Sequence, residues 1–293
     1  MSKNERWIWV NGEWMRDSDA VLPAETKGLL YGAGCFETFR SYGGRFLHLD
    51  DHIERFNRGL TYLGFSRSKH LAVHEVRPVI VELLERNGWS EADARIRIHG
   101  SLGRGSGYSL EPDPSLYRVM TADLLQPQPE GYSLSTVPTR VVPSQSRQSD
   151  LKLSNTLHYM KAWQEARRQG AVDALMLTVD GYIAETAIAN IFWKSGNGVY
   201  TPSEQCDLLP GIVREIVCSL FSTGSDSLKG AGRLETGFFK PEVLEQAEQV
   251  WVTNSVKEIQ PVIAINGTPY PVTGPFYEAL FTAFENYKIM NLN

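Results

Sequence analysis

A short polar segment rich in proline, residues 126–131, divides this chain into two parts. Proline fixes one backbone torsion and lacks an N–H donor, so we expect this segment to be extended and to lie outside any helix or sheet. With 293 residues, the chain is long enough for two domains of ordinary size. We therefore predict a smaller N-terminal α+β domain over residues 1–125, a linker over residues 126–131 and a larger C-terminal domain over residues 132–293.

Both predicted domains mix strand-like and helix-like hydrophobic patterns. In residues 49–63, apolar side chains recur every three or four positions, as they do on one face of a helix. Helices are expected at residues 49–63, 76–87, 157–169, 212–220 and 241–246. Strands are expected at residues 7–10, 35–40, 94–101, 116–125, 132–142, 174–179, 188–194 and 250–253. Strands and helices do not alternate strictly, which favours an α+β fold over a doubly wound parallel sheet.

Composition excludes several classes of function. The formal net charge of −5 argues against a general nucleic-acid or anionic membrane surface. No run approaches the roughly 18 apolar residues of a membrane span, and no apolar segment of a secretory signal follows the first residues. The three cysteines have no paired spacing, which predicts neither a metal site nor a disulfide framework and suits a reducing compartment. We expect a cytoplasmic protein that binds neither nucleic acid nor membrane.

Lys152 and Glu185 are the residues whose chemistry is most informative. A lysine amine can bind a cofactor aldehyde covalently, because burial lowers its charge and makes it nucleophilic. A carboxylate can keep a pyridine nitrogen protonated, so that the ring withdraws electrons from a substrate. Pyridoxal 5′-phosphate (PLP) needs both groups. Most lysines and glutamates are solvated surface charges, so the motifs around this pair must decide.

Those motifs resemble the class IV aminotransferases, the fold type IV family of PLP enzymes, from Trp9 to Ile259. The family includes branched-chain aminotransferases, D-amino acid aminotransferases and 4-amino-4-deoxychorismate lyases. The matching motifs occupy residues 31–40, 52–56, 99–105, 152–157, 185–193, 208–215 and 253–255. The resemblance implies a two-domain α+β fold like that of D-amino acid aminotransferase, with PLP bound by the C-terminal domain.

The resemblance also assigns the cofactor-binding residues. Lys152 would bind PLP covalently and act as the catalytic base, and Glu185 would hold the pyridine nitrogen. Val213 stands where the family usually has threonine, so a hydroxyl is lost while the backbone N–H donor remains. The other residues implied for cofactor binding, mainly at the phosphate, are Arg55, Asn155, Ile212 and Ser255.

The substrate side departs from the family in one place. Tyr31 and Arg104 match residues of the substrate site, and the Arg104 guanidinium would contact a substrate carboxylate. His99 replaces an arginine that relatives carry. Thr38 occupies a position where branched-chain aminotransferases have glycine and the lyases have threonine. In the lyases, this hydroxyl would protonate the methylene carbon of the leaving pyruvate.

The combined prediction is a PLP-dependent lyase that converts 4-amino-4-deoxychorismate to 4-aminobenzoate and pyruvate, a step in folate synthesis. The alternative is a class IV aminotransferase that acts on D-amino acids or branched-chain amino acids; Thr38 argues against it, and His99 keeps it open. A binding protein that retains the fold is disfavoured by the intact Lys152 and Glu185. The resemblance further implies a small-molecule carboxylate substrate and a homodimer.

Overall fold

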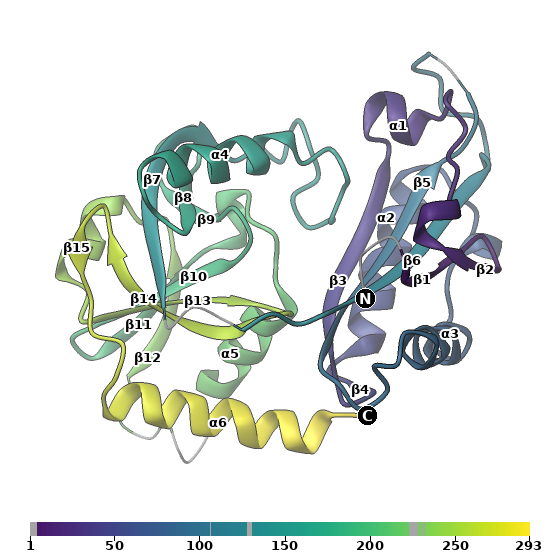
Figure 1. Ribbon diagram of the computed structural model, residues 1–293. Coiled ribbons are helices and arrows are strands. Elements are labelled where there is room, and N and C mark those ends of the chain that lie inside the picture. Colours follow the sequence, from purple (N-terminus) through teal and green to yellow (C-terminus); the bar gives the residue numbers. More distant parts are fainter. Residues whose placement is uncertain (1–4, 106, 128–130, 223–227, 229, 231) are drawn as a thin grey trace. The chain divides into compact units, whose positions relative to one another are not determined.

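The computed structural model describes residues 5–105, 107–127, 131–222, 228, 230 and 232–293 (Figure 1). The chain divides into two compact units. The first consists of Met1–Gln126, Leu151–Asn155 and Leu292–Asn293, and the second of Pro127–Asp150 and Thr156–Asn291. Of the predicted linker at 126–131, residues 128–130 lie outside the described residues.

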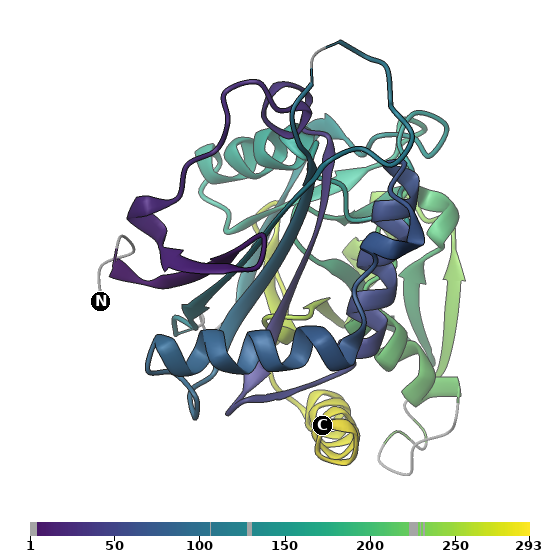
Figure 2. The same ribbon diagram turned by 90° about the vertical axis from the view of Figure 1, so that its right-hand side faces the viewer.

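The first unit is a six-stranded antiparallel sheet with the strand order β2-β1-β6-β5-β3-β4. Its strands are β1 (Trp7–Val10), β2 (Glu13–Arg16), β3 (Gly34–Tyr42), β4 (Arg45–Phe46), β5 (Ala94–Leu102) and β6 (Leu116–Leu124). Its helices are α1 (Lys27–Tyr31), α2 (Leu49–Tyr62) and α3 (Val73–Arg86), with 3-10 turns at Asp17–Asp19 and Arg67–Lys69. Figure 2 shows α2 and α3 over one face of this sheet.

The core of the first unit lies between that face and the two helices. On α2, the predicted apolar spacing is confirmed, since Leu49, Ile53, Phe56 and Leu60 are all buried. Neighbouring side chains of a strand point to opposite faces. On β3, Phe39 therefore joins the core with α2, whereas the side chains at positions 36, 38 and 40 lie on the other face.

The segment Leu151–Asn155 belongs to the first unit, although we predicted it within the C-terminal domain. Its backbone pairs with the beginning of β3: Phe36 N donates to Lys152 O at 2.9 Å, and Ser154 N donates to Gly34 O at 2.8 Å. These bonds join positions more than 100 residues apart in the chain. This pairing places Lys152 next to β3.

The second unit is built on a nine-stranded mixed sheet with the order β12-β11-β10-β13-β14-β7-β8-β9, with β15 paired to β14. The pairs β11–β12, β14–β7 and β7–β8 are parallel. The strands are β7 (Tyr132–Arg140), β8 (Asp173–Leu177), β9 (Ile183–Thr186), β10 (Asn190–Ser195), β11 (Gly198–Pro202), β12 (Arg233–Gly237), β13 (Gln249–Asn254), β14 (Glu258–Ile265) and β15 (Thr268–Pro269). The helices are α4 (Leu157–Arg168), α5 (Ile212–Ser222) and α6 (Pro275–Asn291), with 3-10 turns at Glu204–Cys206 and Pro241–Gln246.

The two central strands β10 and β13 separate two layers of side chains. Trp193 packs on one face in a core with Tyr200 and Phe239. Phe192 and Trp251 stack on the opposite face, with ring centroids 5.6 Å apart. That second face is covered by α5 and α6. Among the described residues, no helix is long and apolar enough to span a membrane.

Candidate active site

Glu185 is a buried carboxylate near the end of β9, a strand whose side chains are all buried. Its Oε1 atom accepts a hydrogen bond from the Tyr159 hydroxyl at 2.5 Å. Its Oε2 atom accepts from Asn190 Nδ2 at 3.3 Å and from the backbone N–H of Leu209 at 3.2 Å. Hydrogen bonds from neutral donors stabilise a carboxylate in its ionised form. Glu185 is thus equipped to act as an oriented anion.

Asn190 connects Glu185 to the beginning of α5. Its Nδ2 atom also donates to Leu209 O at 2.8 Å. Gly211 precedes the helix, and a Cβ atom there would lie 2.3 Å from Asn190 Oδ1. Only glycine therefore permits this close approach. The helix begins at Ile212, as shown by the bond from Glu215 N to Gly211 O at 2.9 Å.

The N-terminus of α5 offers donors for an anion. The N–H groups of Ile212, Val213 and Arg214 point out of the first turn and have no acceptor within the helix. An 11-residue helix also carries partial positive charge at this end. The predicted residues Ile212 and Val213 thus occupy a helix start that suits a phosphate group.

Thr253 adds a second sign of a ligand at this place. It pairs directly with Asn190 across β13 and β10, so the two side chains lie on the same face of the sheet. Its Oγ1 atom is buried and has no hydrogen-bond partner among the described residues. Such a group is costly unless something binds to it. Ser255 follows two residues later, in a turn where Asn254 Oδ1 accepts from the backbone N–H groups of Val256 and Lys257.

In the first unit, Lys152 lies against the face of β3 opposite the helices. Its Nζ atom is 4.8 Å from the centroid of the Phe36 ring. Phe36 pairs with His99 of β5, and Thr38 pairs with Arg97. The Arg97 guanidinium carbon lies 4.0 Å from the same Phe36 centroid. The structure thus brings together three predicted residues around Phe36: Lys152, Thr38 and His99.

The polar groups in this cluster differ in their hydrogen bonding and in their charge at pH 7. The Thr38 Oγ1 atom is buried and has no partner among the described residues. His99 Nε2 lies 2.9 Å from Ser154 Oγ. Burial, and then the nearby Arg97 charge, lowers the pKa of His99 to about 4. His99 is therefore neutral at pH 7, and Arg97 supplies positive charge that His99 does not.

Arg55 lies on the other side of β3, in a buried network between α2 and the sheet. Its Nε and Nη2 atoms donate to Glu37 Oε1 and Oε2 at 2.6 and 2.9 Å. His52 Nδ1 lies 2.7 Å from Glu37 Oε2. Burial alone would raise the pKa of Glu37, but Arg55 and His52 hold it at about 2. The structure does not group Arg55 with Lys152, and its contact with a phosphate stays a prediction.

The remaining predicted residues lie near α1. Tyr31 ends this helix and is 42% exposed, and its hydroxyl accepts from the backbone N–H of Gly107 at 3.1 Å. Arg104 is exposed and forms a backbone bridge with Thr26, the residue before α1. Asn155 is also exposed, and a Cβ atom at Gly32 would lie 3.4 Å from its Cα atom.

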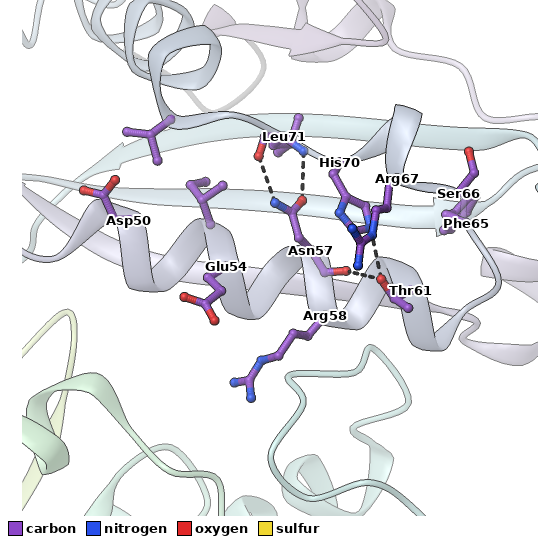
Figure 3. Close-up of a pocket in the computed structure, with 12 residues that line it drawn as sticks. Asp50, Glu54, Asn57, Arg58, Thr61, Phe65, Ser66, Arg67, His70 and Leu71 are labelled. Atoms are coloured by element: carbon purple, nitrogen blue, oxygen red, sulfur yellow. Dashed lines mark hydrogen bonds between the residues drawn. The ribbon is translucent and has the colours of Figure 1, made fainter.

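A separate hollow of about 730 Å³ lies on the outer side of α2 in the first unit (Figure 3). In its wall, Asn57 Nδ2 donates a hydrogen bond to Leu71 O and Asn57 Oδ1 accepts one from Leu71 N, both at 2.8 Å. A second hydrogen bond joins Thr61 Oγ1 and His70 Nε2 at 3.0 Å. None of the predicted site residues lines this hollow. The chemistry expected from the sequence therefore belongs elsewhere.

Three residues that the sequence analysis missed belong to these clusters: Tyr159, Thr253 and Arg97. The alternation of Arg97 and His99 along β5 placed both side chains on one face and could have identified Arg97. No sequence pattern next to Tyr159 indicates that it binds Glu185, and none next to Thr253 indicates that its hydroxyl is buried. The predicted and additional residues include a hydrogen-bonded carboxylate, a helix start that suits a phosphate and a lysine, which are the kinds of group that a PLP-dependent enzyme needs.

Comparison with known proteins gives the family. The model of the class IV aminotransferases matches residues 34–265. The aminodeoxychorismate lyase of Bacillus subtilis (strain 168) is 35% identical over 270 residues, covering 90% of this chain and 88% of the relative. The D-alanine aminotransferase of Bacillus licheniformis is 26% identical over 284 residues, covering 95% and 96%. The chain therefore belongs to the class IV aminotransferase family.

A solved structure shows the same fold. An aminotransferase from Brucella abortus, whose structure contains PLP, matches with a TM-score of 0.84 at 21% identity over 96% of this chain and 98% of the other. The predicted family and the two-domain α+β fold of type IV are thus confirmed. The cofactor predicted from the sequence, PLP, is the cofactor of this family. The Thr253 hydroxyl, which lacks a partner within the described part of the chain, and the N-terminus of α5 fit it.

Proposed function

We propose that this enzyme is a 4-amino-4-deoxychorismate lyase, which forms 4-aminobenzoate and releases pyruvate. The observation that carries the proposal is the Thr38 hydroxyl, which is buried on the same face of β3 as Phe36 and Lys152 and has no hydrogen-bond partner among the residues that the structure describes. An unpartnered buried hydroxyl costs stability. Its presence is explained if it donates a proton to a substrate. The sequence similarity to the aminodeoxychorismate lyase of Bacillus subtilis supports the same proposal.

Several of the residues predicted from the sequence would hold PLP. Lys152 would bind it covalently through Nζ, Glu185 would accept a hydrogen bond from its protonated ring nitrogen, and the first N–H groups of α5 would bind its phosphate. Ser255 and Thr253 would supply hydroxyls to that phosphate. When bound, PLP supplies an electron sink that stabilises negative charge on the carbon next to the substrate amine.

The protein side chains would then move two protons. Lys152 Nζ, acting as the general base, removes the proton from the substrate carbon that carries the amino group. The bond between the ring carbon and the ether oxygen of the enolpyruvyl group breaks, and its electron pair leaves with the oxygen. Thr38 Oγ1 donates a proton to the methylene carbon of this leaving group, which yields pyruvate. The remaining ring is aromatic, which favours elimination.

A second candidate is an aminotransferase that acts on D-amino acids. The similarity to D-alanine aminotransferase supports it. The positive Arg97 beside Phe36, close to Lys152, would also suit the carboxylate of a simple amino acid. This reaction needs no proton from the Thr38 hydroxyl, because Lys152 can both remove the proton from the substrate carbon and deliver it to the cofactor.

Two separate incubations distinguish the candidates. The purified, PLP-loaded protein is mixed with 4-amino-4-deoxychorismate, and 4-aminobenzoate is measured by its fluorescence. A second sample receives D-alanine and 2-oxoglutarate, and pyruvate is measured. The lyase proposal requires 4-aminobenzoate to form at a rate well above that of transamination. Pyruvate from D-alanine without any 4-aminobenzoate would establish the second candidate instead.

The proposal includes assembly as a homodimer. Leu157, Met160 and Trp163 of α4 are 76%, 59% and 42% exposed, and their spacing of three residues places them on one side of the helix. Exposed apolar groups of this kind mark surfaces that associate. Light scattering should give twice the chain mass of 32.9 kDa. A mass equal to one chain would refute the dimer.

A further inference from the structure

Glu185 receives one of its hydrogen bonds from a side chain outside the motif that identified it. Asn190 and Leu209, which bind Oε2, lie in or next to family motifs. Tyr159, which binds Oε1 at 2.5 Å, lies 26 residues before Glu185, in α4. The shortest of these three hydrogen bonds thus comes from a residue to which the sequence gave no function.

Packing fixes the Tyr159 ring. It lies against the buried cluster that contains Val137 and Ala184. Its centroid is 4.1 Å from the centroid of the His158 ring, and the Arg147 guanidinium carbon lies 5.8 Å from the Tyr159 centroid. Side chains with rotamers held in this way position the groups they bind precisely.

The Tyr159 hydroxyl remains a donor at ordinary pH. Burial, and then the negative charge of Glu185, raises the pKa of Tyr159 well above its usual range. Arg147 opposes this effect without reversing it. The nearby His158 has a pKa of about 4, lowered by burial and by Arg147, so it is neutral at pH 7. Over neutral and mildly alkaline pH, the phenol therefore donates its proton toward Oε1.

We propose that Tyr159 is a positioning residue that fixes the orientation of the Glu185 carboxylate toward the ring nitrogen of PLP. A carboxylate with donors on both oxygens cannot rotate without losing a hydrogen bond. The pyridine nitrogen then meets an anion whose direction is already set, as preorganised electrostatic catalysis requires. This inference rests on the proposed role of Glu185 and extends the site by a residue from α4.

The test compares Tyr159→Phe with a matched control in the same unit. Tyr270 is also buried and donates to a backbone carbonyl, Leu244 O, at 2.8 Å. Tyr270→Phe therefore removes a buried phenol hydrogen bond without touching Glu185. Thermal unfolding of both apoproteins measures the structural cost. Binding of PLP to the apoproteins is measured by quenching of tryptophan fluorescence.

We expect Tyr159→Phe to weaken PLP binding about tenfold, the effect of one lost hydrogen bond to a charged group. The proton on the ring nitrogen, followed by NMR of 15N-labelled PLP in a pH titration, should be lost at lower pH, because the carboxylate that holds it is less well oriented. The value of kcat should fall at least tenfold, with KM little changed. Tyr270→Phe should leave PLP affinity and this titration as in the parent, whatever it does to the melting temperature.

Glu185→Gln separates the inference from the function on which it rests. In the Glu185→Gln background, Tyr159→Phe should have no further effect on PLP binding or on the titration. If Glu185→Gln is damaging and Tyr159→Phe alone leaves both at the parental values, the inference about Tyr159 is wrong and the role of Glu185 stands. If Glu185→Gln itself changes neither measurement, the proposed role of Glu185 fails first.

Discussion

Replacing Glu37 by glutamine should destabilise the first unit, because it leaves a buried arginine without its counter-charge. The Glu37 side chain is fully buried, and the Arg55 side chain is 7% exposed. The pKa of Glu37 falls from 4.5 to about 2 in the folded protein. At 1.36 kcal/mol per pKa unit, this difference corresponds to about 3 kcal/mol of stability. Breaking a buried ion pair by removing one partner typically costs about 3–5 kcal/mol, which agrees.

The stability that Glu37 contributes depends on pH, and the direction of its pKa shift gives the direction of that dependence. The folded-state pKa is depressed, so the contribution of Glu37 is fully present above about pH 4.5. It is lost as the pH falls from there to about 2. His52 does not oppose this trend at neutral pH, because burial lowers its pKa and it is uncharged there. The difference in stability between the parent and Glu37→Gln should therefore be largest near neutrality and should shrink in acid.

Thermal unfolding of the apoprotein measures this effect. A loss of about 3 kcal/mol should lower the melting temperature of the first unit by roughly 6–12 °C. Glu82→Gln serves as the control, since Glu82 pairs with Arg86 on the exposed surface of α3 and should change stability by less than about 0.5 kcal/mol. A Glu37→Gln variant that melts within 2 °C of the parent at pH 7 would show that the buried network contributes no net stability.

Three further substitutions test the site. Thr38→Val keeps the shape and removes an unpartnered hydroxyl, so stability should be kept or raised while formation of 4-aminobenzoate falls about 10²–10⁴-fold; the parental rate in this variant would remove Thr38 from the mechanism. Gly211→Ala should push against Asn190 Oδ1 and cost about 1–3 kcal/mol, with weaker PLP binding by fluorescence titration; unchanged melting and binding would mean that the close approach is not needed. Lys152→Ala should abolish turnover, and borohydride treatment followed by mass spectrometry should find no attached cofactor; a retained adduct would point to a different lysine.

Local patterns predicted those parts of the fold in which one face of an element is buried. The helix at Leu49–Tyr62 has four buried apolar residues at regular spacing, and its predicted bounds differ by one residue. The helix at Pro275–Asn291 was missed. Its buried residues also follow helical spacing, but exposed Ile289 and Met290 add apolar side chains outside that face, and the pattern is blurred.

Sequence indicates candidate site residues where a motif carries its own chemistry, and not where partners meet only in three dimensions. Glu185 and Lys152 could be singled out because their side chains suit PLP and their neighbours match the family. Tyr159 could not, because a tyrosine in an amphipathic helix gives no sign of the carboxylate it binds. Thr253 could not either, since the burial of its hydroxyl, away from any partner in the described ranges, is a property of packing and not of sequence.

The threading of the chain through its two units has a consequence for how the protein is made. The first unit needs Leu151–Asn155 beside β3, and its strand β4 pairs with Asn293 through bonds of 2.9 and 3.1 Å. A ribosome that has synthesised only Met1–Gln126 has therefore not yet supplied all of the first unit's backbone partners. The N-terminal sheet can complete its pairing only after most of the second unit has emerged. A protease cut at residues 126–131 would likewise produce two fragments that share one folded unit and remain associated.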